Sequence, residues 1–376
     1  MKIAFVCPYY DPAIDGPKQV IKELASRLIR EGHDVHVYTS DWDKAKRVKI
    51  KEETIDGVKV HRCYHILRVS QFSTVFPSVF FKLIKEDFDV IHTHVTGWAH
   101  VFFASLAAKI KKIRLIHTTH CPWTDAYRTF AGNFWKIISY NIFMRLSYRW
   151  SDKIIAITPW EIHFIEKYGG KGKIEVIPNG VDDIFFKRVK NNSFKKNNKI
   201  NGNIVLFFGR LNVTKGPDKF VLAAKEILKE RKDITFVIIG NDEGMKQEVK
   251  KLIGNEKNIY LLDPIKERAK VAEMYQASEV YVLPSFREGL PLTIFEAMAS
   301  GIPIVASPVN GIPYEMKQPE NGFFCDYGDI NCLKKQILNV IDNKKLALKI
   351  GNNNIKKAKN YKWDDIYTKT ISLYKG

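Results

Sequence analysis

The sequence lacks any stretch that is long and apolar enough to cross a membrane. Its best candidates, residues 75–84 and 101–110, are far shorter than the roughly 18 apolar residues of a spanning helix, and polar groups interrupt them. The apolar run at the N-terminus is also short, and no clear cleavage site follows it. We therefore expect neither a spanning helix nor a signal peptide.

Cysteine is scarce, with five in 376 residues, and no pair has the Cys-x-x-Cys spacing. An odd number without that spacing argues against a disulfide framework and against a zinc ribbon. We therefore expect reduced thiols and a cytoplasmic protein. The glycosylation sequons at Asn191 and Asn212 are then chance matches.

Short repeats and the common nucleic-acid-binding motifs are also absent, although the formal net charge is +19. Without such a motif, nucleic acid is the weakest explanation of that charge. A phosphorylated substrate, an anionic membrane face and a general bias toward lysine all stay open. Residues 73–84 and 130–150 are rich in aromatic and cationic side chains. We interpret them as core helices, with a membrane-surface helix as the alternative.

The chain is longer than one hydrophobic core usually serves, so two domains are expected. Strand-like runs alternate with helical patterns throughout, which indicates a parallel α/β fold. Apolar residues at helical spacing predict a helix around residues 20–29. Strands are predicted at residues 3–8, 34–39, 58–63, 90–94, 115–119, 154–158 and 175–177, and then at 204–208, 234–239, 259–262, 280–283, 303–306 and 323–325.

Residues 187–203 are dominated by Lys and Asn and contain few apolar side chains. We interpret this segment as a linker between a first domain at residues 1–186 and a second domain at residues 204–360. Each domain is expected to be a doubly wound, Rossmann-like unit. Ligands of such folds bind beyond the carboxyl ends of the strands, here in a cleft between the two domains.

Residues 280–301 form the most informative segment, because they read as a strand, a loop and a helix. Pro291 suits the first turn of that helix, and Gly301 suits the position after its end. A helix that begins in a loop favours a phosphate at its N-terminus. Glu288 precedes the helix and Glu296 lies inside it, roughly 12 Å apart if all the intervening residues were helical. Two such carboxylates cannot act on one atom, but they can hold two ends of a nucleotide sugar.

A second loop follows the predicted strand at residues 204–208 and carries Gly209, Arg210, Lys215 and Gly216. Arginine offers a planar pair of donors and lysine a point charge, and both commonly bind phosphate. The two cations are therefore predicted to converge on one diphosphate. The alternative is a pair of surface cations in a lysine-rich chain.

These motifs, in this order, resemble the retaining glycosyltransferases of family 4. The resemblance spans nearly the whole chain. It rests on Asp15-Gly16, Leu24-Ala25, residues 31–35, 88–94, 116–120, 151–157, 176–182 and 208–211, Lys215-Gly216, and the pair Glu288 and Glu296. Two positions depart from the family pattern: Asp15 replaces its first glycine, and Pro17 removes an N–H group after the second.

The resemblance implies the two-domain GT-B fold, completed by a C-terminal helix at residues 361–376 that packs on the first domain. It implies transfer of a sugar, with retained configuration, from a UDP- or GDP-type donor to a hydroxyl of a glycan, lipid-linked or small-molecule acceptor. No metal or other cofactor is implied. A peripheral location at the inner face of a membrane stays open.

The resemblance also assigns site residues. His120, Arg210, Lys215 and Glu288 are expected in catalysis. Donor binding is expected from Gly16, Gly209, Gly289, Leu290, Pro291, Leu292 and Glu296. Within this scheme Arg210 and Lys215 neutralise the diphosphate, Glu288 binds sugar hydroxyls, Glu296 binds the ribose, and His120 faces the sugar.

Other patterns carry less weight. His117 is the alternative to His120 if the register of the strand differs. Neither the pair His92 and His94 nor Asp41-Trp42-Asp43 is interpreted as a metal site, because short spacings of this kind arise easily by chance. A nucleotide-sugar epimerase of the same fold is the main alternative function, followed by a phosphorylase and a nucleic-acid-binding protein.

Overall fold

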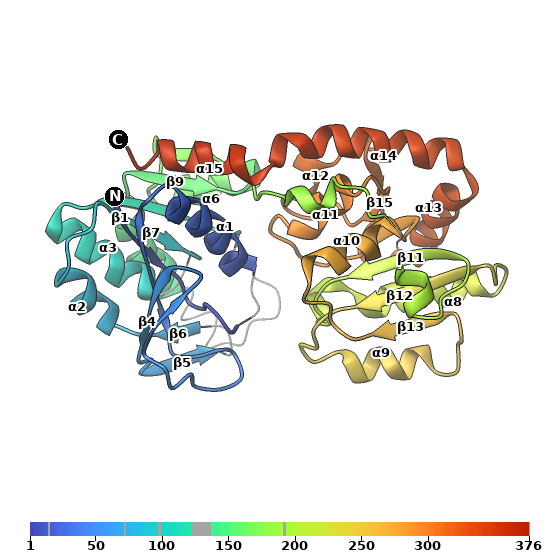
Figure 1. Cartoon of the computed structure of the whole chain (residues 1–376), viewed down its shortest axis with the longest axis horizontal. Coiled ribbons are helices and arrows are strands. Elements are labelled where there is room, and N and C mark those ends of the chain that lie inside the picture. Colours follow the sequence, from blue (N-terminus) through green and yellow to red (C-terminus); the bar gives the residue numbers. More distant parts are fainter. Residues whose placement is uncertain (14–15, 71–72, 97–98, 122–136, 191–192, 376) are drawn as a thin grey trace. The chain divides into compact units, whose positions relative to one another are not determined.

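A computed structural model describes residues 1–13, 16–70, 73–96, 99–121, 137–190 and 193–375. Asp15, Asn191 and residues 130–136, which the sequence analysis considered, lie outside these ranges. Contacts divide the chain into two compact units (Figure 1): residues 1–179 with 363–376, and residues 180–362. No helix in the described ranges is both long and apolar enough to cross a membrane.

The first unit is built on an eight-stranded sheet that is parallel except at one edge. Its order is β10 (Ile174–Val176), β9 (Lys153–Ala156), β8 (Arg114–Thr118), β7 (Val90–His94), β1 (Lys2–Val6), β2 (Asp34–Ser40), β4 (Val58–Cys63) and β3 (Glu52–Ile55). The seven strands predicted for this half are confirmed to within two residues. Antiparallel β3 was not predicted, nor was the hairpin of β5 (Leu67–Ser70) and β6 (Ser73–Val75).

Helices cover this sheet. They are α1 (Gly16–Arg30), α2 (Ser78–Ile84), α3 (Ala99–Lys111), the π-helix η1 (Ser139–Met144), α5 (Arg145–Trp150), the 3-10 turn η2 (Pro159–Glu161), α6 (Ile162–Lys167) and α15 (Trp363–Ser372). The predicted apolar face of α1 is buried. The side chains of Tyr140, Met144 and Tyr148 are also buried, which supports the core interpretation for the described part of residues 130–150.

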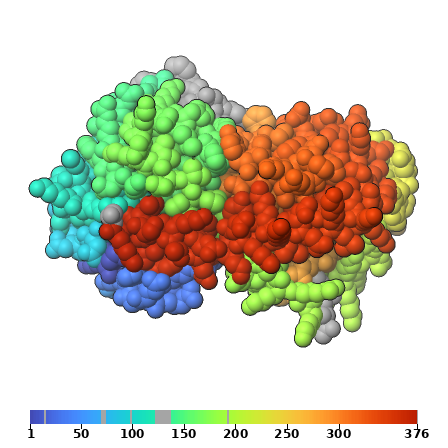
Figure 2. All heavy atoms as spheres, turned by 90° about the horizontal axis from the view of Figure 1, so that it is seen from above, coloured from blue at the N-terminus to red at the C-terminus, as the bar shows by residue number. Residues whose placement is uncertain are grey.

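The C-terminal helix α15 packs beside α1, where Arg27 Nε donates to Asp364 Oδ1 at 2.7 Å. Just after it, Arg114 Nε donates to the carbonyl oxygen of Leu373 at 2.6 Å. Figure 2 shows the red atoms of α15 on the surface of this unit, with green atoms on one side and blue atoms on the other. The end of the chain is thus an integral part of the first unit.

The second unit contains a six-stranded, fully parallel sheet. Its order is β13 (Ile259–Leu262), β12 (Ile234–Ile239), β11 (Asn203–Phe208), β14 (Val280–Leu283), β15 (Ile304–Ala306) and β16 (Gly322–Phe324). All six strands predicted for this half are confirmed. Most apolar side chains of these strands are buried, and those on one face of the sheet join the covering helices in one core, in which the rings of Phe207, Phe220 and Phe236 pack against one another.

The helices and turns of this unit connect the strands and cover the sheet. They are η3 (Asp183–Phe185), α7 (Phe194–Asn197), η4 (Val213–Lys215), α8 (Pro217–Leu228), α9 (Lys246–Ile253), α10 (Arg268–Gln276), α11 (Leu292–Ala299), α12 (Ile312–Glu315), α13 (Ile330–Asp342), α14 (Lys344–Ala358) and η5 (Lys359–Tyr361).

Residues 187–203, predicted as a linker, instead belong to the second unit. Their few apolar side chains explain the difference, because Phe194 and Ile200 are buried. Gln276 also clamps the start of the segment: its Nε2 donates to the carbonyl oxygen of Lys187 at 2.8 Å, and its Oε1 accepts from the amide of Val189 at 2.9 Å.

The cysteines also differ from the prediction. Cys325 and Cys332 form a disulfide that closes a short loop after β16. The linear sequence gave no sign of this pairing, because a spacing of seven residues matches no common pattern and only the turn after β16 brings the two residues together. Cys7, Cys63 and Cys121 are buried thiols.

Candidate active site

The strand order of the second sheet places a topological switch point between the loops that follow β11 and β14. Numbered from β11, the order is that of dinucleotide-binding folds, in which the chain leaves the first strand toward one side and later returns to the other. At such a switch point the two loops diverge, and ligands bind beyond the carboxyl ends of the strands. The predicted residues Arg210 and Lys215 follow β11, and Glu288 follows β14.

Lys215 and Glu288 meet at this point. The Lys215 ammonium lies 2.6 Å from Oε1 and 2.5 Å from Oε2 of Glu288, and Ser285 Oγ donates to Oε1 at 2.7 Å. Only 13% of the lysine side chain and 3% of the glutamate side chain are exposed. A carboxylate can accept about four hydrogen bonds, so Glu288 keeps capacity for one more donor.

Backbone contacts bring these two side chains together. Gly216 has a left-handed φ of 66°, and a Cβ atom there would lie 2.1 Å from the carbonyl oxygen of Pro284. Only glycine allows this approach. The carbonyl oxygen of Thr214 also accepts from the amides of Phe286 (2.9 Å) and Arg287 (3.3 Å). The loop after β11 is therefore locked onto the loop after β14.

Burial lowers the pKa of Lys215, the negative charge of Glu288 opposes that shift, and the positive charge of Arg210 adds to it. Arg210 itself is 41% exposed, and its Nη1 donates to Glu243 Oε2 at 2.9 Å. Asn212 Nδ2 donates to the same oxygen at 2.8 Å, so Glu243, from the loop after β12, orients both side chains.

The second predicted glutamate, Glu296, lies in α11 and is also buried. Its Oε1 accepts from Arg268 Nη1 at 2.7 Å, and its Oε2 accepts from the hydroxyl of Tyr275 at 3.2 Å. Glu288 and Glu296 therefore belong to two separate clusters, as their spacing predicted. Glu296 keeps about half of its accepting capacity.

The termini of α11 agree with the prediction to within one residue. Pro291 precedes the helix with an extended ψ of 131°, rather than occupying its first turn, and Leu292 is the first helical residue. Gly301 follows the helix with φ 75°, as expected of a helix end. Leu290 is buried, whereas Leu292 is half-buried.

The glycines predicted to bind the donor differ in what their neighbours require. A Cβ atom on Gly209 would meet only the ring of Phe207 at 3.8 Å, an ordinary contact, so the surrounding protein does not require glycine there. The strict requirement is at neighbouring Gly240, whose Cβ atom would lie 1.6 Å from the carbonyl oxygen of Gly209. Gly289 accepts from the amide of Gly311 at 3.2 Å, and Asn310 Nδ2 contacts the carbonyl oxygen of Glu288.

Sequence reasoning missed four partners of the predicted residues: Glu243, Arg268, Tyr275 and Ser285. Glu243 and Ser285 follow β12 and β14, so the position of each at a strand end was a usable signal. Arg268 and Tyr275 lie on one face of α10. No pattern in the sequence indicated that this helix packs beside Glu296.

In the first unit, His120 lies two residues beyond β8. His120 and Cys121 both have left-handed backbones, with φ of 58° and 55°. Non-glycine residues adopt this conformation when the surroundings hold them there, and they cluster at functional sites. Buried Glu161 provides such a hold, because its Oε1 accepts from the amide of Cys121 at 2.7 Å.

His117, the alternative to His120, is fully buried. Its Nδ1 bonds with Thr93 Oγ1 (2.8 Å) and its Nε2 with Thr96 Oγ1 (2.9 Å), so both ring nitrogens are occupied. His120 is the more accessible of the two. In the part of the chain that the structure describes, no group of three or more His, Cys, Asp or Glu side chains could hold a metal ion.

The cluster of buried histidines predicts a strong pH dependence of stability. Burial lowers the pKa of His92 to about 3 and of His100 to about 4, and holds the pKa of His94 and His117 well below the usual range. Below about pH 6.5 the unfolded chain therefore binds protons that the folded chain does not.

The free energy of unfolding should accordingly fall by about 1.4 kcal/mol per pH unit for each such histidine as the pH drops from about 6.5 toward 4. Chemical denaturation at half-unit pH steps measures this slope. A decline that begins only near pH 4.5, where carboxylates titrate, would contradict the burial of these rings as neutral groups.

Gly16, also predicted to bind the donor, is the exposed first residue of α1, and a Cβ atom there would meet nothing within 4 Å.

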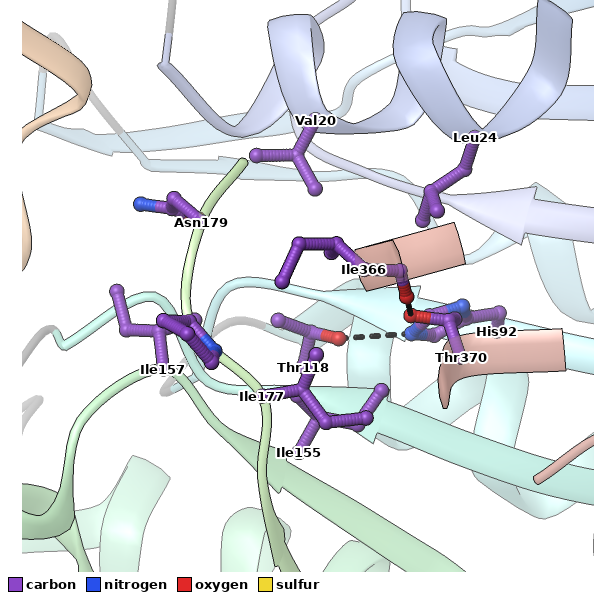
Figure 3. A pocket seen from close by; sticks show the side chains of 11 residues that line it. Val20, Leu24, His92, Thr118, Ile155, Ile157, Ile177, Asn179, Ile366 and Thr370 are labelled. Carbon is purple, nitrogen blue, oxygen red and sulfur yellow. Dashed lines mark hydrogen bonds between the residues drawn. The ribbon is translucent and has the colours of Figure 1, made fainter. Parts of the chain in front are cut away.

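Figure 3 shows a cavity deeper in this unit, where His92 Nε2 bonds with Thr118 Oγ1 at 2.8 Å. The cavity has a volume of about 20 Å³, enough space for about one water molecule, and is lined mainly by Val, Leu and Ile side chains. It is too small for a substrate.

Comparisons with known proteins identify the family of the chain. Residues 14–184 match the family described as Glycosyltransferase Family 4, and residues 189–357 match Glycosyl transferases group 1. The chain is 30% identical to a UDP-Gal:alpha-D-GlcNAc-diphosphoundecaprenol alpha-1,3-galactosyltransferase of Escherichia coli, over 72% of this chain and 71% of that protein. It is 26% identical to an uncharacterised glycosyltransferase of Methanocaldococcus jannaschii, over 100% and 97% of the two chains.

Among solved structures, HepE from Anabaena in complex with UDP and glucose aligns with a TM-score of 0.81 and 19% identity, over 100% of this chain and 99% of that one. At this identity the likeness shows the fold alone, which is GT-B. The two matched families and the galactosyltransferase relative show that the chain belongs to glycosyltransferase family 4, the glycosyl transferases group 1, whose members transfer a sugar from a nucleotide-sugar donor.

Proposed function

We propose that the protein is a retaining glycosyltransferase that uses a uridine diphosphate sugar and a lipid-linked acceptor. The observation that carries the proposal is the buried pair of Lys215 and Glu288 at the switch point of the second sheet, with Arg210 in the same loop as Lys215. The named substrates of relatives support the choice of donor and acceptor: UDP-Gal and a diphosphoundecaprenol in one case, phosphatidylinositol in another.

In this proposal Arg210 and Lys215 bind the diphosphate. Negative charge grows on the leaving oxygen as its bond to the sugar breaks. Cations already held in place stabilise that charge without reorganising. Glu288 fixes the Lys215 ammonium through both carboxylate oxygens, and its remaining acceptor capacity suits a sugar hydroxyl. The loop that carries Glu288 leads directly into α11, whose N-terminal end adds positive potential there.

Glu296 is the proposed ligand of the ribose. Arg268 and Tyr275 hold its two oxygens, so its orientation is set before a nucleotide binds. Gly209, Gly289, Leu290, Pro291 and Leu292 would line the donor site with backbone and apolar surface. A contact of Gly16 with the donor and a contact of His120 with the sugar stay predictions from family resemblance.

Thermal denaturation with a panel of nucleotides tests the donor. A ligand at 100 times its dissociation constant raises the free energy of unfolding by about 2.7 kcal/mol. We expect UDP to raise the unfolding temperature more than GDP, ADP or dTDP does, and uridine without phosphates to have little effect. If none of the nucleotide diphosphates raised the unfolding temperature, the proposed donor site would be contradicted. The anomeric configuration of the product, read by NMR, tests retention, and turnover of donor without acceptor would favour an epimerase.

We further propose that a cationic and apolar surface of the first unit contacts an anionic membrane face. Four large side chains are exposed there: Ile50 (55%), Tyr64 (62%), Ile66 (64%) and Leu67 (55%). Tyr64, Ile66 and Leu67 lie just before or at the start of β5, the strand labelled at one edge of this unit in Figure 1, and Ile50 lies just before β3. The neighbouring loop contributes Lys44, Lys46, Arg47, Lys49 and Lys51.

The cations and rings of this surface are held together. The Arg47 guanidinium lies 4.1 Å from the centre of the Tyr64 ring, and that of Arg68 lies 4.0 Å from the centre of the Trp42 ring. Arg47 also pairs with Asp41, whose other oxygen bonds with His65 Nδ1. Asp41 is thus committed to these partners. Aliphatic and aromatic side chains ringed by cations match the chemistry of an anionic bilayer surface.

Vesicle sedimentation measures this contact. The protein should bind vesicles rich in phosphatidylglycerol and not pure phosphatidylcholine, and the paired change Ile66→Asp and Leu67→Asp should abolish binding. Leu348→Asp is the matched control, because Leu348 on α14 is 70% exposed and also has lysines nearby. Equal loss in the control, or binding that ignores lipid charge, would contradict the assignment.

A further inference from the structure

His94 and His120 form a hydrogen-bonded pair at the carboxyl edge of the first sheet. His94 is the last residue of β7 and is fully buried, and its Nδ1 lies 2.8 Å from Nε2 of His120. The two rings stack at a centroid distance of 5.1 Å. His94 therefore contacts the predicted active-site histidine directly.

Both rings are neutral at pH 7, because burial holds the pKa of His120 near 3 and that of His94 well below its usual range. A neutral imidazole carries one N–H group and one lone pair. In a hydrogen bond between two neutral rings, one must donate and the other must accept. The pair therefore has only two possible arrangements of its protons.

The other nitrogen of His94 decides between them. Nε2 of His94 is buried and makes no hydrogen bond within the described residues. If it carried the proton of His94, that N–H group would be buried without an acceptor, which costs the full desolvation of the donor. Buried donors without acceptors are rarer in proteins than buried acceptors without donors. The proton of His94 is therefore on Nδ1, the atom that faces His120.

We infer that His94 is a positioning residue: its Nδ1–H donates to Nε2 of His120 and thereby places the proton of His120 on Nδ1. Among the described residues, Nδ1 of His120 makes no hydrogen bond, and it is not among the buried polar atoms without a partner. His120 thus presents an N–H donor to a substrate oxygen. That last step rests on the proposed function, because it needs His120 to face the sugar.

The surrounding backbone makes this device rigid. The left-handed φ of His120 sets the direction of its ring, and Glu161 holds the next amide. On the other side, the amide of Val95 donates to the carbonyl oxygen of Thr118 at 3.0 Å, and the amide of Thr96 to that of Thr119 at 3.1 Å, so the ends of β7 and β8 stay paired. These bonds hold the backbone segments that carry the two rings at a fixed separation.

Nitrogen-15 NMR of the wild-type protein tests the inference without any substitution. The ring nitrogens of His120 should show a protonated Nδ1 and an unprotonated Nε2 at pH 7. The reverse pattern would overturn the inference. Assignment of the His120 signals comes from their loss in His120→Ala, and the activity of that variant tests the proposed role of His120 separately.

Substitutions at His94 then test the consequence for turnover. His94→Leu removes the donor, so His120 should populate both tautomers. kcat should fall by on the order of 10- to 100-fold, the scale expected when a group in a site is misplaced. KM for the nucleotide sugar should stay near the wild-type value. His94→Asn places an amide N–H where Nδ1–H was, so it should restore the tautomer and most of the lost kcat.

A matched control is His117→Asn, which removes another buried histidine of the same unit that bonds only with Thr93 and Thr96 among described residues. It should lower stability but leave the His120 tautomer unchanged. The positioning role would be contradicted if His94→Asn had the same low kcat as His94→Leu. It would also be contradicted if the His120 tautomer stayed the same in every His94 variant.

Discussion

Replacing Lys215 with Met is expected to lower kcat/KM by on the order of 10²–10³, the range found when one charge-stabilising donor is removed from an active site. Methionine keeps most of the length of the side chain but carries no charge. Only the exposed Arg210 would then remain to neutralise the leaving diphosphate, because the buried cation would be absent. Steady-state kinetics with saturating acceptor measures the loss.

Lys215→Met also leaves the buried carboxylate of Glu288 without its cationic partner. Removing one partner of a buried ion pair destabilises a protein by about 3–5 kcal/mol, because the remaining charge is desolvated without compensation. Lys215→Met and Glu288→Gln should each lower stability, and the double variant should be more stable than the sum of the two losses predicts. Activity should stay low in all three proteins.

This pattern separates the pair from an ordinary surface contact. Lys195→Met is the matched control: Lys195 pairs with Glu279 at 3.4 Å, and both side chains are more than a third exposed. An exposed pair of this kind contributes about 1 kcal/mol or less, and the variant should keep its activity. Wild-type turnover in Lys215→Met would contradict the assignment of the leaving-group site.

Replacing Glu296 with Gln is expected to weaken nucleotide binding roughly 10- to 100-fold, the scale of a lost hydrogen bond to a charged group. The effect should appear in the dissociation constant of UDP and in KM, with a smaller change in kcat, because the ribose lies away from the breaking bond. Calorimetric titration of UDP into the variant measures it. Lys215→Met and Glu296→Gln thus divide the site into a part that stabilises the reaction and a part that holds the nucleotide.

Glu279→Gln is the control for this second prediction. Glu279 precedes β14 and accepts from the amide of Ile204 at 2.7 Å, so it lies at the amino ends of the strands, away from the loops that carry the site. It should bind UDP as the wild-type protein does. Unchanged UDP affinity in Glu296→Gln, or equal weakening in Glu279→Gln, would show that Glu296 is not a ribose ligand.

The sequence was sufficient for the order of the strands along the chain and for which loops carry the charged residues. Buried parallel strands are continuous apolar runs, and each such run was visible, from residues 3–8 to residues 323–325. The pairing of Glu288 with Lys215 follows once β11 and β14 are neighbours in the sheet, since both residues follow the carboxyl ends of those strands.

Other features depend on contacts between distant segments. The polar segment at residues 187–203 looks like a linker because only two or three apolar side chains anchor it, and nothing local shows that Phe194 and Ile200 are buried. Antiparallel β3 is short and largely exposed, so it has no apolar pattern. The partners Arg268 and Glu243 come from α10 and from the loop after β12, and their distance from Glu296 and Arg210 is set by packing rather than by spacing in the chain.

A crystal structure with bound uridine diphosphate shows whether the loops after β11 and β14 hold the diphosphate. We expect the Lys215 ammonium and the Arg210 guanidinium to contact phosphate oxygens, and the Glu296 carboxylate to contact the ribose hydroxyls. A nucleotide bound elsewhere, with Arg210 and Lys215 directed away from every phosphorus atom, would contradict the proposed donor site.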